Sequence, residues 1–354
     1  MISAKTKVVI VGPSLKTQGG ITSVLSVYHS NFKEQFNMKF IGSYLGNGRI
    51  KDMAYFTGAL TRVFWECLTN KKAVFHIHTA SKGSYLRKSI IAKLCMRMKN
   101  RVILHIHGGK FDEFMDNSTP RKKEKIISLL NSAEKIVVLS ETWRSYFSQY
   151  VPPKKLAVIY NPCSTMVEEY EERRNQKPNI VFLGKLCERK GIYDLIEAVK
   201  KISRSNFILN LYGDGEIEAV KKLIEKENLS HKIFVNGWVP HEIIADLYDA
   251  ADILVLPSYV EGLPMVVLEA IGRGLPVVAT NVGGTAEAVM DGESGFIINP
   301  GDVNDLAKKL EILINDADLR ERMGRRSLEI AAKKFSINEI RRQLETLYRG
   351  VCNG

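Results

Sequence analysis

The sequence has few cysteines and no long apolar run, and both shortages restrict what the protein can be. Five cysteines are scattered among 354 residues without paired spacing, which indicates neither a disulfide framework nor a zinc site and favours a reducing compartment. No stretch approaches the roughly 20 apolar residues of a bilayer-spanning helix. The run Val8–Val11 is too short for a signal-peptide core, and we interpret it as a first strand. We therefore expect a cytoplasmic protein.

Acidic residues are scarce in the first half of the chain. Residues 1–165 hold 26 Lys and Arg but only 9 Asp and Glu, a net charge of +17, whereas residues 166–354 hold 25 and 30, a net of −5. A basic half indicates an anionic partner, which leaves nucleic acid, an anionic membrane and an anionic substrate open; general solubility is the alternative. Because no aromatic-interleaved basic strand or nucleic-acid motif is present, we expect no nucleic-acid partner.

Length and pattern predict an α/β protein of two domains. The chain exceeds the size at which a single core stops growing, and strands alternate with helices in both halves, which predicts two doubly wound parallel sheets. We predict an N-terminal domain over residues 1–165, a charged linker over 166–178 and a second domain over 179–334. A C-terminal helix within 335–354 is expected to pack back on the first domain. The ligand edges of the two sheets are expected to face each other across a central cleft.

One stretch of the second half combines a strand, a turn and a helix with two carboxylates. The apolar run Ile253–Leu256 predicts a buried strand, Gly262 a turn, and Pro264 the first position of a helix. Glu261 lies at the turn and Glu269 on the helix. The free N–H groups of a helix start bind anions such as phosphate. The pattern thus predicts a nucleotide diphosphate whose sugars lie near the glutamates; a helix with a surface Glu at each end is the alternative.

Two further loops follow predicted strands and precede helices. Gly19-Gly20 lies in a potential anion cradle, although it is not a dinucleotide-binding fingerprint. Lys185 and Lys190 bracket a loop in the second half, where two ammonium groups suit a diphosphate as point charges. Solvated loop lysines are the alternative for this pair.

Four histidines occur in pairs at the ends of two predicted strands. His76 and His78 share one face of their strand, and His105 and His107 share one face of theirs. A metal site is one interpretation, but no carboxylate or cysteine lies nearby in a ligand pattern. A satisfied buried histidine is the more frequent case. His107 is the exception, because the glycine pair after it leaves its edge open.

Six motifs in the expected order, spread over nearly the whole chain, resemble those of the family 4 retaining glycosyltransferases, which have the GT-B fold. The motifs are Glu261-(seven residues)-Glu269, Gly184-Lys185-Leu186 with Lys190-Gly191, Tyr212-Gly213-Asp214-Gly215, Pro276–Thr280 with Gly283-Gly284, the Gly19-Gly20 loop and His107-Gly108. The second half matches closely and the first half more loosely. The resemblance implies two Rossmann-like domains, an N-terminal one for the acceptor and a C-terminal one for the nucleotide-sugar.

The resemblance also implies an activity and a set of site residues. We expect retaining transfer of a sugar from a UDP- or GDP-linked donor to a glycan or lipid-linked acceptor in bacterial surface polysaccharide biosynthesis, without cofactor or metal. Expected catalytic residues are His107, Glu261 and Lys190. Expected donor contacts are Lys185, Lys190, Glu261, Gly262, Leu263, Met265, Glu269, Gly19 and Gly20. Asn236, Trp238 and Val239 are expected near the base.

The resemblance gives the basic first half a role and leaves two other functions open. The predicted helix Ser84–Lys99 is dense in cations, with an expected inner apolar stripe of Leu86, Ile90, Ile91 and Leu94, and Arg121–Lys125 starts another basic helix. We hypothesise that these cations, Lys88 among them, dock the domain peripherally on an anionic membrane. A sugar-nucleotide epimerase or hydrolase on the same scaffold and, less favoured, a basic nucleic-acid-binding protein are the alternatives.

Overall fold

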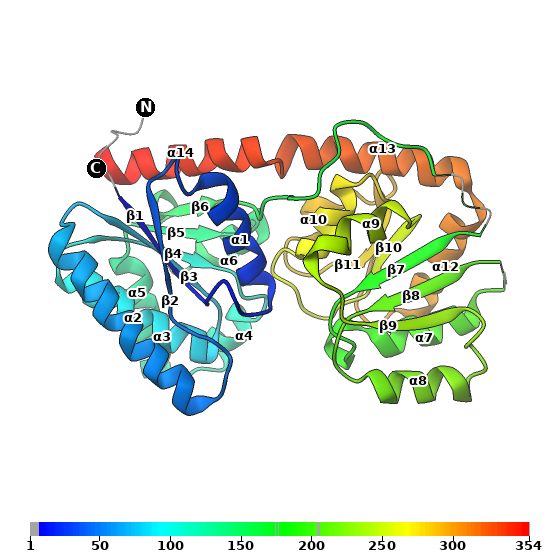
Figure 1. Ribbon diagram of the computed structural model, residues 1–354, viewed down its shortest axis with the longest axis horizontal. Helices are drawn as coiled ribbons and strands as arrows, with labels where there is room; N and C mark the ends of the chain where they lie inside the picture. Colours follow the sequence, from blue (N-terminus) through cyan, green and yellow to red (C-terminus); the bar gives the residue numbers. More distant parts are fainter. Residues whose placement is uncertain (1–6, 174, 176, 204–205, 354) are drawn as a thin grey trace. The chain divides into compact units, whose positions relative to one another are not determined.

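The computed structural model describes residues 7–173, 175, 177–203 and 206–353, which divide into two compact units (Figure 1). Unit 1 holds the described residues up to Pro162 together with those from Ile337 onward, and unit 2 holds Cys163–Ser336. The C-terminal helix α14 (Ile337–Asn353) therefore belongs to the first unit.

Unit 1 is built on a six-stranded parallel sheet in the order β2-β1-β3-β4-β5-β6. Its strands are β1 (Val8–Gly12), β2 (Met38–Gly42), β3 (Val74–Thr79), β4 (Arg101–Ile106), β5 (Lys135–Val138) and β6 (Leu156–Val158). Its other α-helices are α1 (Gly20–Phe32), α2 (Arg49–Thr69), α3 (Lys82–Arg97), α4 (Phe111–Asp116), α5 (Pro120–Ser132) and α6 (Glu141–Phe147). A short 3-10 turn, η1 (Pro153–Lys155), precedes β6. The inner strands are buried on both faces, as their near-continuous apolar runs require.

Unit 2 repeats this architecture with the order β12-β11-β10-β7-β8-β9. Its strands are β7 (Asn179–Leu183), β8 (Ile208–Tyr212), β9 (Ile233–Gly237), β10 (Ile253–Leu256), β11 (Val277–Thr280) and β12 (Gly295–Ile298). Its helices are α7 (Ile192–Lys201), α8 (Ile217–Lys226), α9 (Ile244–Asp249), α10 (Met265–Gly272), α11 (Thr285–Ala288), α12 (Val303–Asn315) and α13 (Ala317–Lys334), with 3-10 turns η2 (Glu188–Lys190) and η3 (His241–Ile243). The predicted α/β fold with two doubly wound parallel sheets is confirmed.

Helix α3 turns a face to the sheet that differs in part from its predicted stripe. Leu86 and Ile90, assigned to the inner stripe, are 62% and 43% exposed, whereas Lys88 is almost fully buried. Ile91 of the predicted stripe is buried, and Leu94 packs against the core as a partly buried residue. The buried stripe is Lys88, Ile91, Ala92 and Cys95, at the i, i+3, i+4, i+7 spacing of one helix face. Lys88 is therefore not a surface cation, and burial, together with the charge of Arg87, lowers its pKa to about 7.

Helix α2 is not predicted from the sequence at all. Its buried residues Ala59, Val63, Glu66 and Cys67 form a narrow inner stripe, while large apolar residues such as Ile50 and Trp65 are 87% and 64% exposed. Apolar residues on both the inner and the outer face obscure the helical period.

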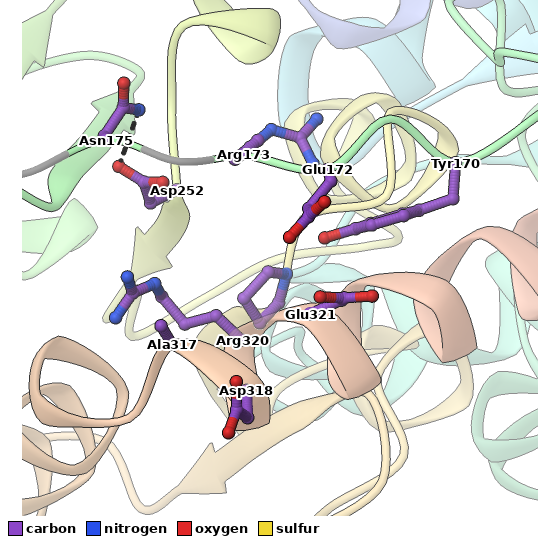
Figure 2. A pocket seen from close by; sticks show the side chains of 10 residues that line it. Tyr170, Glu172, Arg173, Asn175, Asp252, Ala317, Asp318, Arg320 and Glu321 are labelled. Atoms are coloured by element: carbon purple, nitrogen blue, oxygen red, sulfur yellow. Dashed lines mark hydrogen bonds between the residues drawn. The ribbon is translucent and has the colours of Figure 1, made fainter.

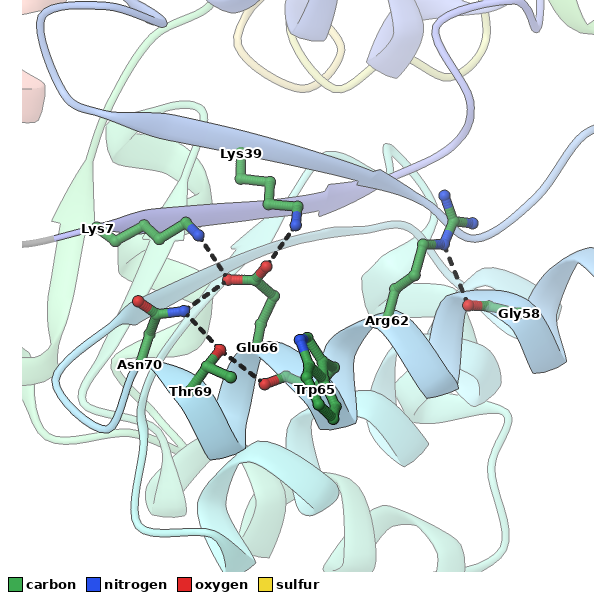
Figure 3. A network of polar contacts seen from close by, with 8 residues as sticks. All are labelled: Lys7, Lys39, Gly58, Arg62, Trp65, Glu66, Thr69 and Asn70. Carbon is green, nitrogen blue, oxygen red and sulfur yellow. Dashed lines mark hydrogen bonds and ion pairs between the residues drawn. The ribbon is translucent and has the colours of Figure 1, made fainter.

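Glu66 anchors the end of α2 to the amino edge of the sheet (Figure 3). Its buried carboxylate pairs with Lys7 at 2.8 Å and with Lys39, and accepts a hydrogen bond from Asn70 Nδ2 at 3.0 Å. Burial raises the pKa of Glu66, but the hydrogen bonds from Lys39 and Lys7 outweigh it and leave this pKa below its usual value. The network thus stabilises the fold above the unfolded pKa of Glu and loses its effect as the pH falls through the lowered one.

The segment predicted as a linker packs on unit 2. Arg173 donates to the backbone oxygens of Arg273 and Gly274, and Asn175 donates to Asp252 at 2.9 Å. Of the predicted range 166–178, Arg174 and Gln176 lie outside the described residues. A cavity of about 260 Å³ borders this segment (Figure 2). Its wall includes Asp252 and Pro276, which precede β10 and β11, so it lies at the amino edge of the sheet.

Candidate active site

The topology of unit 2 defines where a ligand is expected. Strands β7 and β10 lie side by side, and the chain continues from β7 to β8 on one side and from β10 to β11 on the other. In open α/β sheets ligands bind at the carboxyl edge beside such a reversal of strand order. The loop after β7 carries Lys185 and Lys190, and the loop after β10 carries Glu261.

An ion pair joins these two loops. Lys190 Nζ lies 2.5 Å from Glu261 Oε1, and the two side chains are only 15% and 11% exposed. Gly191 makes the close approach possible: its φ of +69° favours glycine, and a Cβ there would lie 2.0 Å from the carbonyl oxygen of Pro257. Tyr259 N also donates to Arg189 O at 2.9 Å. The ammonium and the carboxylate predicted from the sequence are therefore held together across the strand-order reversal.

Helix α10 begins one residue later than predicted. Pro264 is the N-cap residue, with φ −72° and ψ 123°, and the helix starts at Met265. Only the four steps from Met265 to Glu269 are helical, about 6 Å of rise, rather than eight steps and about 12 Å from Glu261. Val267 N and Leu268 N donate to the carbonyl oxygen of Pro264 at 3.2 and 3.3 Å, so the amides that a helix start leaves without a carbonyl partner are those before Val267. Binding of an anion by these amides beside Glu261 stays a prediction.

Glu269 is buried inside unit 2 rather than exposed on its helix. It is 3% exposed, and Tyr248 Oη donates to its Oε2 at 3.2 Å. Burial raises the pKa of Glu269 to about 7, and the hydrogen bond from Tyr248 only partly opposes this. A buried carboxylate with few hydrogen-bond partners is stabilised by any ligand that donates hydrogen bonds to it. Sequence analysis missed Tyr248, which lies on another helix 21 residues away.

A third loop, after β11, supports the turn at Glu261. Gly284 N donates to Gly262 O at 2.6 Å, and a Cβ at Gly283, whose φ is +57°, would lie 2.3 Å from the carbonyl oxygens of Glu261 and Gly262. The glycine pair after β11 thus allows the two backbones to touch. Leu263 is buried, and Met265 follows it as the first helical residue.

The three residues predicted near the base lie on strand β9 or just after it. Strand β9 and the Glu261 loop after β10 are on opposite sides of β7, whose loop bears Lys185 and Lys190. Asn236 is an exposed residue of β9 whose side-chain amide donates to Asn210 at 3.0 Å, so it belongs to a ladder of amides across the sheet. Trp238, just after β9, is 56% exposed, and Val239 is partly buried. The approach of Asn236, Trp238 and Val239 to a base stays a prediction. Lys185, which was predicted as a donor contact, is exposed.

The carboxyl edge of unit 1 carries the histidines. Strands β3 and β4 pair with His78 opposite His105, which puts all four rings on one face. His76, His78 and His105 are fully buried, whereas His107 is partly exposed. Tyr28 of α1 and Tyr348 of α14 cover the stack, and Tyr348 Oη lies 2.8 Å from His76 Nδ1.

The rings of these histidines are stacked and hydrogen-bonded to one another. His78 Nδ1 lies 2.8 Å from His107 Nε2, and His76 Nε2 lies 3.1 Å from His105 Nδ1. Desolvation lowers the pKa of His107 to about 3, so its ring is neutral at neutral pH. Because Nε2 of this ring contacts His78, Nδ1 is the nitrogen left for a further hydrogen bond. Sequence analysis did not find His78 as the partner of His107.

The same cluster brings three imidazole nitrogens, one each from His76, His78 and His105, within 4.8 Å of one another. The ring planes of His76 and His105 are only 15° apart, and lone pairs of nearly parallel rings do not converge on one tetrahedral centre. The geometry therefore favours a hydrogen-bonded stack, and metal independence stays a prediction.

The glycine loop of unit 1 lies at the same edge as the histidines. Gly19 is the N-cap of α1, and a Cβ added at Gly19 or Gly20 would meet no atom within 4 Å. The space beside this helix start is thus open to a ligand. The structure places Gly19, Gly20 and His107 in unit 1 and the remaining candidate residues in unit 2.

Sequence analysis also overlooked an Asp-x-Asp sequence, Asp316-Ala317-Asp318. Its first carboxylate caps helix α13, where Asp316 Oδ1 accepts a hydrogen bond from Leu319 N at 2.8 Å. Asp318 borders the cavity at the amino edge of the sheet. The pair therefore has a structural role away from the carboxyl edge.

In a comparison with known proteins, most of unit 2 matches one family model. Residues 167–329 match the family described as Glycosyl transferases group 1. The chain is 29% identical to an uncharacterized protein in the cps region of Klebsiella pneumoniae, over 69% of each chain. It is 32% identical to the capsular polysaccharide biosynthesis glycosyltransferase CapM of Staphylococcus aureus, over 51% of this chain and 48% of that enzyme. The match thus spans about half of CapM.

Solved structures share the fold over the whole chain. Sucrose-phosphate synthase of Thermosynechococcus elongatus gives a TM-score of 0.78 at 17% identity, with 98% of both chains covered. Anabaena HepE, crystallised with UDP and glucose, gives 0.76 at 18% identity, with 97% of this chain and 100% of that chain covered. At these identities the likeness establishes the two-domain GT-B fold.

Proposed function

Because this chain carries a glycosyl transferases group 1 domain on a GT-B fold, we propose that it transfers a sugar, with retention of configuration, from a nucleotide-diphosphate-sugar to a glycan or lipid-linked acceptor. The observation that carries the proposal is the Lys190–Glu261 pair across the strand-order reversal of unit 2, next to the start of α10. We further propose that this transfer serves polysaccharide biosynthesis, because the chain is similar to CapM, a capsular polysaccharide biosynthesis glycosyltransferase.

Unit 2 binds the donor in this proposal. Lys185, Lys190 and the amides of Gly262, Leu263 and Met265 neutralise the diphosphate, and Glu269 accepts hydrogen bonds from the ribose hydroxyls. Glu261 is shared between Lys190 and a hydroxyl of the donor sugar. Structural neighbours of this fold were crystallised with UDP, which is consistent with a diphosphate ligand.

The chemistry follows from the charges that develop. The bond from the anomeric carbon to the phosphate oxygen breaks, positive charge grows on the sugar and negative charge on the departing diphosphate. Lys190 and the helix amides stabilise that negative charge, an effect that typically changes turnover by about 10²–10³ per donor. The acceptor oxygen then bonds to the anomeric carbon on the same face, and its proton passes to the leaving phosphate. His107, which is neutral, orients a hydroxyl of the sugar or the acceptor.

Unit 1 supplies the acceptor side and a membrane contact. Within the described residues no helix is long and apolar enough to cross a bilayer. Helix α2 instead exposes Ile50, Met53, Trp65 and Leu68 by 87%, 70%, 64% and 47%. Exposed apolar residues combined with the positive charge of residues 1–165 suit peripheral binding to an anionic leaflet at the cytoplasmic face.

A thermal-shift screen of the full chain against UDP-, GDP- and ADP-sugars tests the donor assignment. The cognate nucleotide raises the melting temperature by mass action, and no response to any nucleotide-sugar would contradict the proposal. Incubation with donor alone distinguishes an epimerase or hydrolase, which turns over without an acceptor. Transfer in excess EDTA should stay within about twofold of the untreated rate, and proton NMR of the product should show the anomeric configuration of the donor.

A further inference from the structure

A cavity of about 610 Å³ lies in unit 1 between α3, α4 and α5. It is separate from the histidine stack, which lies on the other face of β3 and β4 under α1 and α14. Residues of these three helices and of the loops before α4 and α5 form its walls.

Apolar and aromatic side chains form part of the wall. The ring of Tyr85 packs against Phe114 at 5.5 Å between centroids, and Ile126 is fully buried beside them. Leu86 is 62% exposed, so this part of the wall is apolar surface that the protein itself leaves uncovered. Covering such a side chain with a ligand is favourable because apolar surface leaves water.

Cations dominate the polar part of the wall. Five lysines and one glutamate line the cavity, a net charge of +4. Glu113 pairs with Lys110 at 3.1 Å, and Lys122 Nζ lies 4.5 Å from the centre of the Phe114 ring. Lys82, Lys93 and Lys125 form no ion pair within the described part of the chain. The wall therefore combines unneutralised positive charge with uncovered apolar surface.

One end of the cavity lies next to His107. Lys82 opens α3 directly after β3, and Lys110 lies three residues after His107. The two loops touch, since a Cβ at Gly108 would lie 3.2 Å from Ser81 N. Both loops leave the carboxyl edge of the sheet, so a molecule in the cavity extends from that edge along α3.

We propose that this cavity binds a phosphate or diphosphate ester of a long apolar chain, with the phosphate on the lysines and the chain along Leu86 and Phe114. Such a molecule satisfies both features of the wall, whereas inorganic phosphate satisfies only its charge and a neutral amphiphile only its apolar part. The inference rests on the proposed function, for which it names the acceptor class: a glycan carried on a phosphorylated lipid.

Isothermal titration of the full chain with n-decyl phosphate, below its micelle-forming concentration, tests the site. We expect saturable one-to-one binding, at least about tenfold tighter than for decanol or inorganic phosphate. The double variant Lys93→Gln/Lys125→Gln and the single variant Leu86→Ser, all at exposed positions, should each weaken this binding about fivefold or more. Matched controls outside the cavity, Lys71→Gln/Lys72→Gln and Phe234→Ser, should leave it unchanged.

Equal loss in the control variants, equal affinity for inorganic phosphate or decanol, or unsaturable uptake would each overturn the proposal. Nucleotide-sugar binding is measured on the same samples, because it depends on unit 2. Variants that lose decyl phosphate but keep the nucleotide support the cavity. A wild type that binds decyl phosphate but no nucleotide-sugar would contradict the proposed function and leave the cavity assignment standing.

Discussion

The two units share a six-stranded parallel sheet but place different chemistry at its carboxyl edge. Unit 1 has a stack of neutral imidazoles that ends at His107, in a part of the chain with a net charge of +17. Unit 2 has the Lys190–Glu261 ion pair and the buried Glu269, in a part with a net charge of −5. The topology determines where a ligand binds, and the loops after the strands determine which ligand. Substitutions that affect one unit without the other test this division.

The largest expected effect is at the edge of unit 1. His107→Ala should lower transfer about 10³-fold, because the sugar or acceptor hydroxyl loses its orienting partner, while nucleotide affinity by calorimetry stays the same. His29→Ala is the matched control, since His29 packs on Phe40 in the same unit and should leave transfer unchanged. Full transfer activity of His107→Ala would remove this residue from the site.

A somewhat smaller effect is expected from the cation of unit 2. Lys190→Ala should lower turnover about 10²-fold, a larger effect than its harm to folding, because its charge acts on the departing diphosphate. Lys200→Ala is the control. Lys200 also pairs with glutamates, with Glu197 at 3.0 Å and with Glu227 at 2.9 Å, but it lies on helix α7 rather than in the loop after β7. Equal turnover in the two variants would show that Lys190 has only a structural role.

Glu269→Gln should weaken nucleotide binding while raising the stability of the unliganded protein. Nucleotide affinity should fall about tenfold by calorimetry, because the amide is a weaker acceptor for hydroxyl groups than a carboxylate. The unliganded variant should nevertheless be more stable than wild type at pH 8, by up to about 4 kcal/mol in urea unfolding.

The sign of that stability change follows from the pKa of Glu269. Its folded value of about 7 lies above the unfolded value of about 4.3, so the folded state holds a proton that the unfolded state releases. Wild-type stability from this group therefore falls as the pH rises from about 4 through 7, and Gln abolishes that fall. A variant less stable than wild type at pH 8 would contradict the burial cost assigned to this carboxylate.

The smallest expected effect concerns the membrane contact of unit 1. Trp65→Ser should weaken sedimentation with liposomes that contain anionic lipid by about fivefold, since one exposed apolar side chain contributes roughly 1 kcal/mol. Phe234→Ser, at a residue of unit 2 that is 42% exposed, should have no effect. Wild-type binding that is equally strong on neutral vesicles would disprove the electrostatic part of this contact.

The sequence predicts the sheets and the strand, turn and helix around Glu261 well because local rules govern them. Apolar runs predict the strands, and the turn, proline and carboxylate pattern from Glu261 to Glu269 predicts a helix start within one residue. The partners of the candidate site residues could not be predicted. Tyr248 reaches Glu269, His78 reaches His107 and Gly283 reaches the backbone of Glu261 only through tertiary packing. The inner stripe of helix α3 was predicted correctly for Ile91 and Leu94 and wrongly for Leu86 and Ile90, because Lys88 occupies an inner position while those two residues remain outside.

The central claim is that the start of α10 and the loop after β7 hold a nucleotide diphosphate. Amide hydrogen exchange of the full chain, with and without a saturating nucleotide-sugar, measures this contact directly. We expect protection of the amides in residues 185–191 and 262–268, with little change in β12 or α13. Binding accompanied by protection elsewhere, and none in these two segments, would contradict the account.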